Sequence, residues 1–415
     1  MNILLLAQEY PPESAMGGVG SYMHSIAHAY TQMGHTVHVV STAAPGQASY
    51  TYMQDRVQVH RIRRWKFELP VLRRIWHAYF PWTKHQLEYA FGLYGALARI
   101  VRVNKIEIIE ATELWAEGLF YSFTRQVPIL IRLHTPLFVL RALNQMRATR
   151  DWRIVDALDK EWTRRADRII AGSRSLADIV AERYHLDAQN IPIIPVPVNL
   201  ERFPALPPAL DDAAPLALYT GQLEPRKGVF TLVEAIPRVM AEIPNARFVF
   251  VGNDRVFDGR STRAALEAQL NALGVARYAS FTGALPNTEL GAQLRRAHVC
   301  VFPSQWEAVG IACLEAMASA RAVIASRVGG LQDMIQDQHS GLLIPPGDPA
   351  ALATALVELL KNPTRARALG IQARARVEQS YAPNVIARRN LAEYDNTLRN
   401  WNAKHGVSQV PSNQN

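Results

Sequence analysis

The stretch HVCVFPSQWEAVGIACLEAMA, residues 298–318, decides the fold class of this chain. An apolar, strand-like run leads into a loop, and the following run has the composition of a helix. A strand joined by a short loop to a helix is the repeating unit of α/β folds. Two acids interrupt this unit, Glu307 in the loop and Glu315 inside the expected helix. They are either a helix-start carboxylate and a solvated side chain, or parts of one site.

The same alternation extends from this stretch in both directions. Residues 3–7 predict a strand, GGVGSYMHSIAHAYTQM a helix that Gly34 ends, and TVHVVST a second strand. Helices are also expected from about Val229, around residues 262–273 and from about Pro349. Further strands are expected at KIEIIEA, VPILIRLHT, ADRIIAGS, IPIIPVPV, LALYTGQL, ARFVFVG, ASFTGAL, AVIASRV and GLLIPPG. Apolar strands that alternate with helices predict parallel sheets covered on both faces.

A proline-rich segment divides the chain into two similar halves. Residues 191–215 read IPIIPVPVNLERFPALPPALDDAAP, which predicts a linker. We therefore expect two doubly wound, Rossmann-like α/β domains that face each other across a cleft, at residues 1–200 and 201–385. A C-terminal helix within residues 386–415 is expected to return to the first domain, with a disordered tail after Trp401. Ligands of this architecture bind at the carboxyl ends of the strands.

Composition limits the protein class. The chain has 415 residues, of which 49% are hydrophobic. Its two cysteines, Cys300 and Cys313, lie in apolar runs, which favours buried free thiols over a disulfide framework or a zinc site. The first residues, MNILLLAQEY, lack a basic leader and a cleavage site, and no segment has the length of a membrane-spanning helix. We expect a cytoplasmic chain.

The positive charge is concentrated in one segment. The net charge is +9, and residues 56–84 hold eight Lys or Arg and one acid, Glu68. Three interpretations remain open: an anionic membrane surface at the inner face of the membrane, a nucleic acid, for which no recognition motif is present, or a solvated face. The first is our prediction, and no nucleic-acid partner is expected. The aromatic residues interleaved with these cations are Trp65, Phe67, Trp76, Tyr79, Phe80 and Trp82.

Two loops predict a phosphate site. Gly17 and Gly18 follow the first strand and open the first helix, where free N–H groups favour an anion. The spacing of the glycines does not match a dinucleotide fingerprint. In the second half, the loop GQLEPRKG places Arg226 and Lys227 next to a helix start, which suits a diphosphate better than a solvated turn.

Acidic residues and a glycine turn predict a second part of the same site. The run AVIASRVGGLQDMI ends a strand with Gly329 and Gly330 and adds an acid, Asp333. Glu307, Glu315 and this turn all lie at carboxyl ends of strands or on the helices that follow. Carboxylates are good acceptors for sugar hydroxyls. The site is therefore expected to bind a diphosphate at one end and a polyol at the other.

Together, GQLEPRKG, FTGAL, PSQWEAVGIACLEAMA and AVIASRVGG resemble the retaining glycosyltransferases of the GT-B class, family 4. Glu307 and Glu315 match that family's E-x7-E motif. The resemblance implies a GT-B fold and transfer of a hexose from a nucleotide sugar to an acceptor, with retention and without a metal or another cofactor. It further implies a role in surface polysaccharide or glycolipid synthesis, with a lipid-linked acceptor among the expected acceptors.

The resemblance also implies roles for individual residues. Glu307 approaches the donor sugar hydroxyls, Glu315 the ribose, and Lys227 the diphosphate, while His134, at the end of VPILIRLH, faces the sugar near the reacting carbon. A histidine at a strand end can also be an ordinary core residue. The expected catalytic residues are His134, Glu307 and Lys227. The expected donor-binding residues are Gly17, Gly18, Gln222, Arg226, Lys227, Val309, Gly310 and Glu315.

Two positions depart from the family pattern. The family usually has Gly-Arg where this chain has Gly221 and Gln222, which removes one cation that Arg226 is expected to replace. Asp333 stands where the family has a glutamate, one methylene longer. These departures leave a weak or inactive sugar-nucleotide-binding relative open as an alternative. A nucleotide-sugar epimerase, another enzyme class on this architecture with a different family pattern, is a second alternative.

Overall fold

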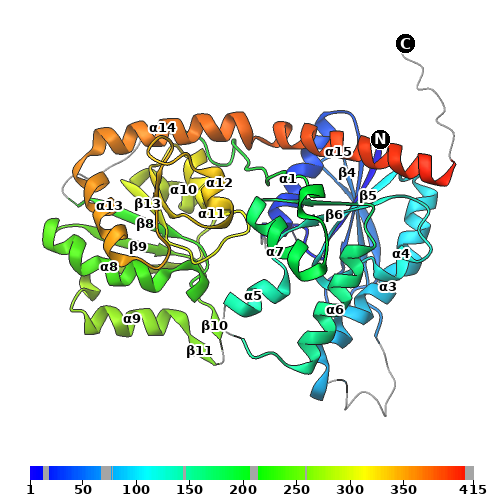
Figure 1. The fold of residues 1–415 in the computed structure, drawn as a ribbon, viewed down its shortest axis with the longest axis horizontal. Coiled ribbons are helices and arrows are strands. Elements are labelled where there is room, and N and C mark those ends of the chain that lie inside the picture. Colours follow the sequence, from blue (N-terminus) through cyan, green and yellow to red (C-terminus); the bar gives the residue numbers. More distant parts are fainter. Residues whose placement is uncertain are drawn as a thin grey trace.

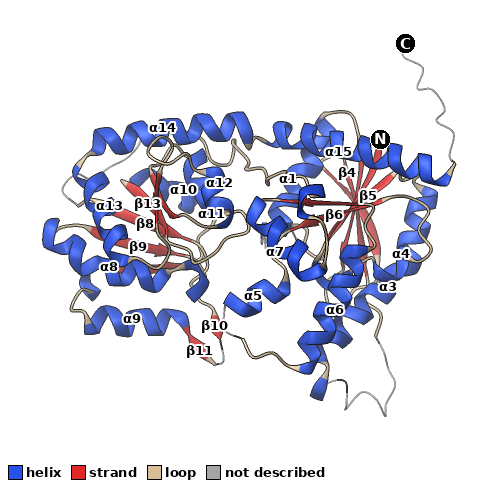
Figure 2. Ribbon diagram, viewed as in Figure 1, coloured by secondary structure: helices blue, strands red, loops and turns tan. Residues whose placement is uncertain are grey.

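The structure, a computed structural model, describes residues 1–12, 18–66, 76, 78–143, 146–205, 214–257 and 259–406. The chain forms two α/β halves that lie side by side, each with a parallel sheet between helices (Figures 1 and 2). The fold class predicted from the sequence is confirmed. The expected boundaries at residues 200 and 385 stay a prediction.

The N-terminal half is built on a sheet with the strand order β3-β4-β2-β1-β5-β6-β7. The pairs are parallel except for β3, which runs antiparallel to β4. The sequence analysis missed β3 and β4. The strands are β1 (Asn2–Leu6), β2 (Thr36–Thr42), β3 (Tyr50–Gln54), β4 (Val57–Ile62), β5 (Ile108–Thr112), β6 (Ile129–Leu133) and β7 (Arg168–Ala171).

Helices cover both faces of this sheet. Alternate residues of β1 point to opposite faces, so Ile3 and Leu5 pack with the side of α1, and Leu4 and Leu6 pack with the side of α3. All four are buried. The helices are α1 (Gly18–Gln32), α3 (Pro81–Val103), α4 (Leu119–Ser122), α5 (Leu137–Leu143), α6 (Arg150–Arg164) and α7 (Arg174–Tyr184), with short turns η1 (Leu114–Ala116) and η2 (Ala188–Asn190).

The C-terminal half repeats the design with the all-parallel order β12-β9-β8-β13-β14-β15. Its strands are β8 (Leu216–Thr220), β9 (Arg247–Val251), β12 (Ala279–Gly283), β13 (Val299–Phe302), β14 (Val323–Ser326) and β15 (Leu342–Ile344), with a small hairpin of β10 (Val256–Phe257) and β11 (Arg260–Ser261). Its helices are α8 (Val229–Glu242), α9 (Thr262–Ala272), α10 (Asn287–Arg296), α11 (Ile311–Ala318), α12 (Gly329–Met334) and α13 (Pro349–Lys361), with turns η3 (Pro225–Lys227) and η4 (Ala276–Tyr278).

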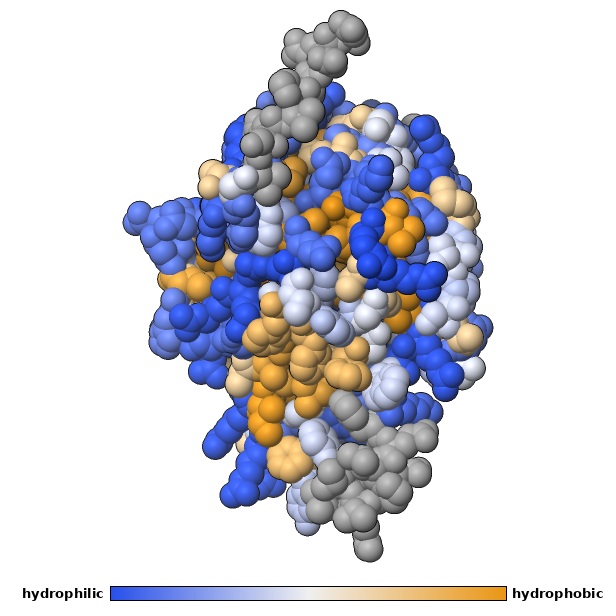
Figure 3. All heavy atoms as spheres, turned by 90° about the vertical axis from the view of Figure 1, so that its right-hand side faces the viewer, coloured by the Kyte–Doolittle hydropathy of each residue, from blue (hydrophilic) through white to orange (hydrophobic). Residues whose placement is uncertain are grey.

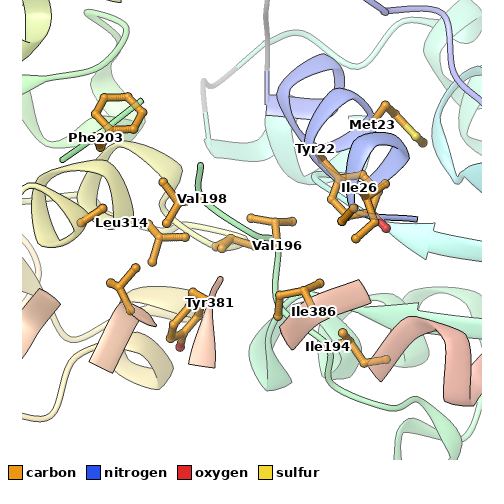
Figure 4. Close-up of a cluster of buried hydrophobic side chains, with 14 of the residues drawn as sticks. Tyr22, Met23, Ile26, Ile194, Val196, Val198, Phe203, Leu314, Tyr381 and Ile386 are labelled. Carbon is orange, nitrogen blue, oxygen red and sulfur yellow. The ribbon is translucent and has the colours of Figure 1, made fainter. Parts of the chain in front are cut away.

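The segment between the halves corrects one prediction. IPIIPVPV was expected to form a strand, but residues 191–198 make only an isolated bridge at Ile193. Prolines remove the N–H donors that a ladder needs. The segment is nevertheless well packed, because Ile194, Val196 and Val198 are buried in a hydrophobic cluster that reaches from α1 to α11 (Figure 4).

The last two helices run along the molecule. Helix α14 (Pro363–Ser380) lies over the C-terminal half, and α15 (Pro383–His405) lies over the N-terminal half, against α1 (Figure 1). The tail was expected to be disordered after Trp401, but the helix continues to His405. Residues 407–415 lie outside the described residues. Among the described residues, no helix is long and apolar enough to cross a membrane.

A buried polar cluster attaches α15 to the first sheet. Glu110 of β5 forms an ion pair with Arg132 of β6 (Nε–Oε1, 2.9 Å) and accepts hydrogen bonds from the hydroxyls of Tyr22 and Tyr394. Asn390 of α15 accepts a hydrogen bond from Arg132 and donates one to Tyr22. We call these five residues the Glu110 cluster. All are at most 1% exposed, so the cluster is sealed from solvent.

Candidate active site

Two loops of the C-terminal half bring an acid and two cations together. Glu307, in the loop after β13, accepts hydrogen bonds from the Lys227 ammonium and from the Ser304 hydroxyl (3.0 Å). Its other oxygen lies 3.3 Å from Arg226 Nη1. Arg226 also pairs with Glu224. We call these five residues the Glu307 cluster.

The two cations keep Glu307 ionised. Burial alone would raise the pKa of the Glu307 carboxyl, but the charges of Lys227 and Arg226 and the hydrogen bonds outweigh burial and lower it. The two cations differ in how much of each side chain is exposed to solvent. The Lys227 side chain is 18% exposed, whereas Arg226 is 8% exposed and also donates to the Trp306 carbonyl at 3.3 Å. Lys227 is therefore the cation that a ligand can reach.

A close approach of the backbone makes this cluster possible. Gly228 has a φ of +67°, and a Cβ there would lie 1.7 Å from the Pro303 carbonyl oxygen. Only glycine fits at such a position. Because the two loops touch there, the Gln305 N–H donates to the Arg226 carbonyl at 2.8 Å. The loop that carries Lys227 is thus fixed against the loop that carries Glu307.

The same C-terminal loop meets the N-terminal half across the cleft. The Trp306 indole N–H donates to the Ser175 hydroxyl at 3.2 Å. Val309 packs so closely on Gly172 that a Cβ at Gly172 would lie 2.6 Å from Val309 Cγ2. Gly310, with a φ of +93°, precedes the first residue of α11. The predicted residues Val309 and Gly310 thus lie where the two halves touch.

The first helix also points its N-terminus at this place. A Cβ at Gly18 would lie 3.1 Å from Ile311 Cδ1, so the starts of α1 and α11 face each other. The first N–H groups of a helix have no carbonyl partner within the helix, and the helix start is the positive end of its dipole. Gly17, for which the same role was expected, lies outside the described residues.

His134 lies directly after β6, on the N-terminal side. Its backbone N–H donates to both carboxyl oxygens of Glu113 at 2.9 Å, and its ring meets Tyr22 edge-on. Ring atom Nε2 is buried and has no hydrogen-bond partner among the described residues. Burial, followed by the charge of Arg132, lowers the pKa of His134 to about 3, so the imidazole is neutral at physiological pH. A neutral ring with a spare nitrogen can bind a hydroxyl.

Two other predicted acids have their partners outside the Glu307 cluster. Burial raises the pKa of Glu315 to about 7, against the charge of Arg202 in the segment between the halves. Asp333 of α12 accepts a hydrogen bond from the Arg174 N–H of the N-terminal half at 3.1 Å. Glu315 is thus a partly protonated acid next to the linker, and Asp333 forms a contact between the halves.

The structure adds residues that the sequence analysis missed. The Gln222 side chain accepts a hydrogen bond from Arg255 Nε at 3.0 Å, although the two lie 33 positions apart. Burial raises the pKa of Glu113 and of Glu117 to about 8. In the sequence these two acids follow a strand and carry no motif, so only their burial distinguishes them. Among the described residues, no group of three or more His, Cys, Asp or Glu could hold a metal ion.

Comparisons with known proteins agree with this geometry. Residues 207–376 match the family described as "Glycosyl transferases group 1", and residues 16–202 match "Glycosyltransferase Family 4". A glycogen synthase of Mycobacterium tuberculosis (strain CDC 1551 / Oshkosh) is 26% identical over 411 residues, 93% of this chain and 92% of the relative. An MMP alpha-(1->4)-mannosyltransferase of Mycolicibacterium hassiacum is 23% identical over 428 residues, 96% and 98% of the two chains.

Solved structures share the fold. The sucrose-phosphate synthase of Thermosynechococcus elongatus superimposes with a TM-score of 0.76 at 25% identity, covering 96% of this chain and 99% of that chain. The two family matches leave out only the first 15 residues, residues 203–206 and the end of the chain. The chain therefore belongs to the group 1, family 4 glycosyltransferases, with a GT-B fold.

Proposed function

We propose that this protein is a retaining hexosyltransferase that uses a nucleotide-diphosphate sugar as donor. The carrying observation is the Glu307 cluster, in which a partly exposed Lys227 and a charged Glu307 lie at the loop that leads into α11, whose first residue faces the start of α1. Such a site has groups for a diphosphate and for sugar hydroxyls. The names of the relatives, glycogen synthase and mannosyltransferase, support a hexose as the transferred sugar. In this proposal the C-terminal half binds the donor and the N-terminal half the acceptor.

The donor takes the place of contacts that the free protein makes within itself. The diphosphate binds the Lys227 ammonium and the N–H groups at the start of α1, including Gly18. The Glu307 oxygen that accepts from Lys227 in the free protein loses this contact and accepts hydrogen bonds from the sugar hydroxyls instead. Val309 and Gly310 bring the backbone close to the sugar, and Glu315 accepts a hydrogen bond from the ribose. Arg226 acts by holding Glu307 rather than by touching the donor.

The proposed transfer step uses these groups. The bond between the anomeric carbon and the diphosphate oxygen breaks, and the acceptor hydroxyl oxygen bonds to the same carbon from the same face. The configuration is retained because the new bond forms on the face that the leaving diphosphate occupied, and the acceptor proton passes to the leaving phosphate. The neutral His134 binds a sugar hydroxyl near the reacting carbon through Nε2. Cationic side chains and helix starts stabilise the leaving diphosphate, so the step requires no metal ion.

The acceptor is proposed to be lipid-linked and to be met at an anionic membrane surface, in surface polysaccharide or glycolipid synthesis. Figure 3 shows an apolar patch on the side of the molecule where α3 and α4 lie. Trp65, Phe91 and Phe123 are 54%, 44% and 60% exposed, and Trp65 stacks edge-on against Phe91. Exposed aromatic groups of this kind suit a membrane interface.

The cations of the predicted segment contribute less than their number suggested. Arg61 is fully buried and donates to the backbone at Tyr10, and Lys84 pairs with Glu88. The exposed cations among the described residues of the segment include Arg63 and Lys66, next to the apolar patch. Residues 67–75 and 77 of the segment, which include Phe67, Glu68, Arg73 and Arg74, lie outside the described residues. The proposal places the enzyme in the cytoplasm, peripheral to the inner face of the membrane.

A donor panel tests the proposed function. The protein is incubated with UDP-, GDP-, ADP- and dTDP-hexoses without acceptor, and sugar release is followed by proton NMR. We expect slow hydrolysis of one donor, with the α-anomer of an α-linked donor formed first, and the same rate with EDTA. Release of the inverted anomer would contradict retention. Loss of activity with EDTA would contradict metal independence. The absence of both binding and hydrolysis across the panel would contradict the donor class.

A further inference from the structure

Arg255 lies on the loop that follows β9, and the backbone fixes its position. The Leu223 N–H donates to the Asn253 carbonyl at 2.9 Å, and the Arg255 N–H donates to the Leu223 carbonyl at 3.2 Å. The loops after β8 and β9 are therefore paired beyond the ends of their strands. This pairing brings Arg255 next to Gln222, at the carboxyl end of β8.

The side chain of Arg255 is exposed but held at one end. Its Nε donates to the Gln222 side-chain oxygen at 3.0 Å, and Gln222 is itself fixed because the Tyr219 hydroxyl donates to its carbonyl at 2.7 Å. The two terminal amino groups of the guanidinium make no hydrogen bond to other described residues. The guanidinium is therefore held in position by Gln222 and exposed to solvent, where an anion can bind it.

The charge of this cation acts on Glu9, an acid beside the first turn of α1: a Cβ at Gly20 would lie 3.5 Å from Glu9 Cβ. Glu9, on the loop after β1, accepts a hydrogen bond from the Gly20 N–H in the first turn of α1. Burial raises the pKa of Glu9, while that hydrogen bond and the positive charge of Arg255 oppose the rise. Arg255 thus acts electrostatically on Glu9, and its side chain is attached to Gln222 of the loop after β8. Lys227 belongs to the same loop as Gln222.

We propose that Arg255 binds the donor diphosphate together with Lys227, and that Gln222 is a positioning residue that holds the Arg255 guanidinium in place. The inference rests on the proposed donor class. A guanidinium binds phosphate oxygens through two parallel hydrogen bonds. The missing arginine at position 222 is thus replaced by an arginine of the neighbouring loop. Arg226, which was expected to fill this role, is held by Glu224 and Glu307 instead.

Calorimetric titration with nucleoside diphosphates tests this assignment. The wild type is titrated with UDP, GDP, ADP and dTDP, and the nucleotide that binds most tightly is used for four variants. These are Arg255→Gln, Gln222→Ala, the exchange Arg255→Gln with Gln222→Arg, and the control Arg263→Gln. Arg263 is in the same region but pairs with Glu267, and both side chains are 44% exposed.

We expect Arg255→Gln to weaken binding by about 10- to 100-fold, the range for hydrogen bonds to charged groups. Gln222→Ala should weaken it less, because it leaves the guanidinium in place but free to move. The exchange should restore affinity to within about threefold of wild type, because it returns a guanidinium to the same place. Arg263→Gln should leave binding unchanged, and the melting temperatures of all four variants should match the wild type.

Three results would overturn the inference. Wild-type affinity in Arg255→Gln, with binding intact in the wild type, would remove Arg255 from the site and leave the proposed function standing. A loss in Arg255→Gln that Gln222→Arg does not restore would assign the effect to the loop instead of the charge. A wild-type protein that binds no nucleoside diphosphate would overturn the proposed donor class and this inference together.

Discussion

The Glu110 cluster and the Glu307 cluster use the same chemistry in different surroundings. Each joins a buried glutamate to an arginine. In the Glu110 cluster, no buried side-chain atom lacks a hydrogen-bond partner, and the side chains of both Glu110 and Arg132 are 0% exposed. In the Glu307 cluster, the buried Nε of Arg226 has no partner among the described residues, and Lys227 is partly exposed.

The difference indicates what each cluster does. Buried charges are costly unless every hydrogen bond is made, and a completed network fixes a single arrangement. The Glu110 cluster is complete and joins β5, β6, α1 and α15, so we assign it to the attachment of the last helix. The Glu307 cluster is not sealed in this way, because Lys227 is partly exposed and a ligand can reach its ammonium. The predictions below separate stability from activity on this basis.

The largest expected effect is on stability, at the Glu110 cluster. Glu110→Ala leaves the Arg132 charge buried without its acid, which should lower the free energy of unfolding by about 3–5 kcal/mol. Urea unfolding measures this, with Glu242→Ala as a control, because Glu242 belongs to an exposed pair with Lys361. A loss below about 1 kcal/mol would mean that the cluster does not hold α15 in place.

The next effect is on activity, at the cleft. Lys227→Ala should lower kcat/KM for the donor by about 100-fold or more, because the ammonium stabilises the leaving diphosphate. The control is Lys361→Ala, which removes the exposed partner of Glu242 and should leave turnover unchanged. Near-normal turnover in Lys227→Ala would remove this lysine from the site.

Glu117 sharpens the comparison, because it is a buried acid without a close cation. One oxygen accepts from the Gln8 N–H at 2.9 Å, and the other has no partner among the described residues. Burial raises its pKa from 4.5 to about 8. Between these values the folded state binds more protons than the unfolded state, so the free energy of unfolding falls as pH rises from about 4.5 to 8.

Glu117→Gln removes this titration and keeps the shape of the side chain. The variant should be more stable than wild type by about 1–3 kcal/mol at pH 8, with a smaller or no difference at pH 5. Urea unfolding at pH 5, 6.5 and 8 checks this expectation. Parallel pH profiles for the two proteins would show that Glu117 does not titrate in this range.

The smallest effects are expected from single cations on the surface. Lys66→Gln and Arg63→Gln should each weaken binding to anionic vesicles by roughly 1 kcal/mol, or about fivefold, because each is one charge near the lipid. Vesicle co-sedimentation at low and high salt measures this, with the exposed Arg260→Gln of the other half as control. Wild-type protein that stays in the supernatant with anionic vesicles at low salt would end the membrane proposal.

The sequence predicted the sheets and the cleft better than the state of the side chains. Strand and helix periodicity located β13, α11 and most other elements, because their apolar runs are continuous. The apolar residues of IPIIPVPV suggested a strand, but its prolines lack the N–H donors that strand pairing needs. The short β3 and β4 were missed.

The clusters depend on contacts between distant parts of the chain. The ion pair of Glu307 and Lys227 joins positions 80 apart, and the hydrogen bond from Arg132 to Asn390 joins positions 258 apart. The motif predicted that Glu307 and Lys227 share a site, but not that Arg226 is occupied by two acids. Arg255 could not be predicted, because only the paired backbones of two loops bring it to Gln222.

The most direct test of the central claim is the paired measurement of activity and stability in Glu307→Gln. This variant removes the charge at the cleft but leaves Arg226 paired with Glu224. The account predicts that kcat/KM for donor turnover falls by about 100-fold or more, while the free energy of unfolding changes by less than about 2 kcal/mol. Near-normal turnover, or a loss of stability as large as that of Glu110→Ala, would contradict the claim that the Glu307 cluster is the active site.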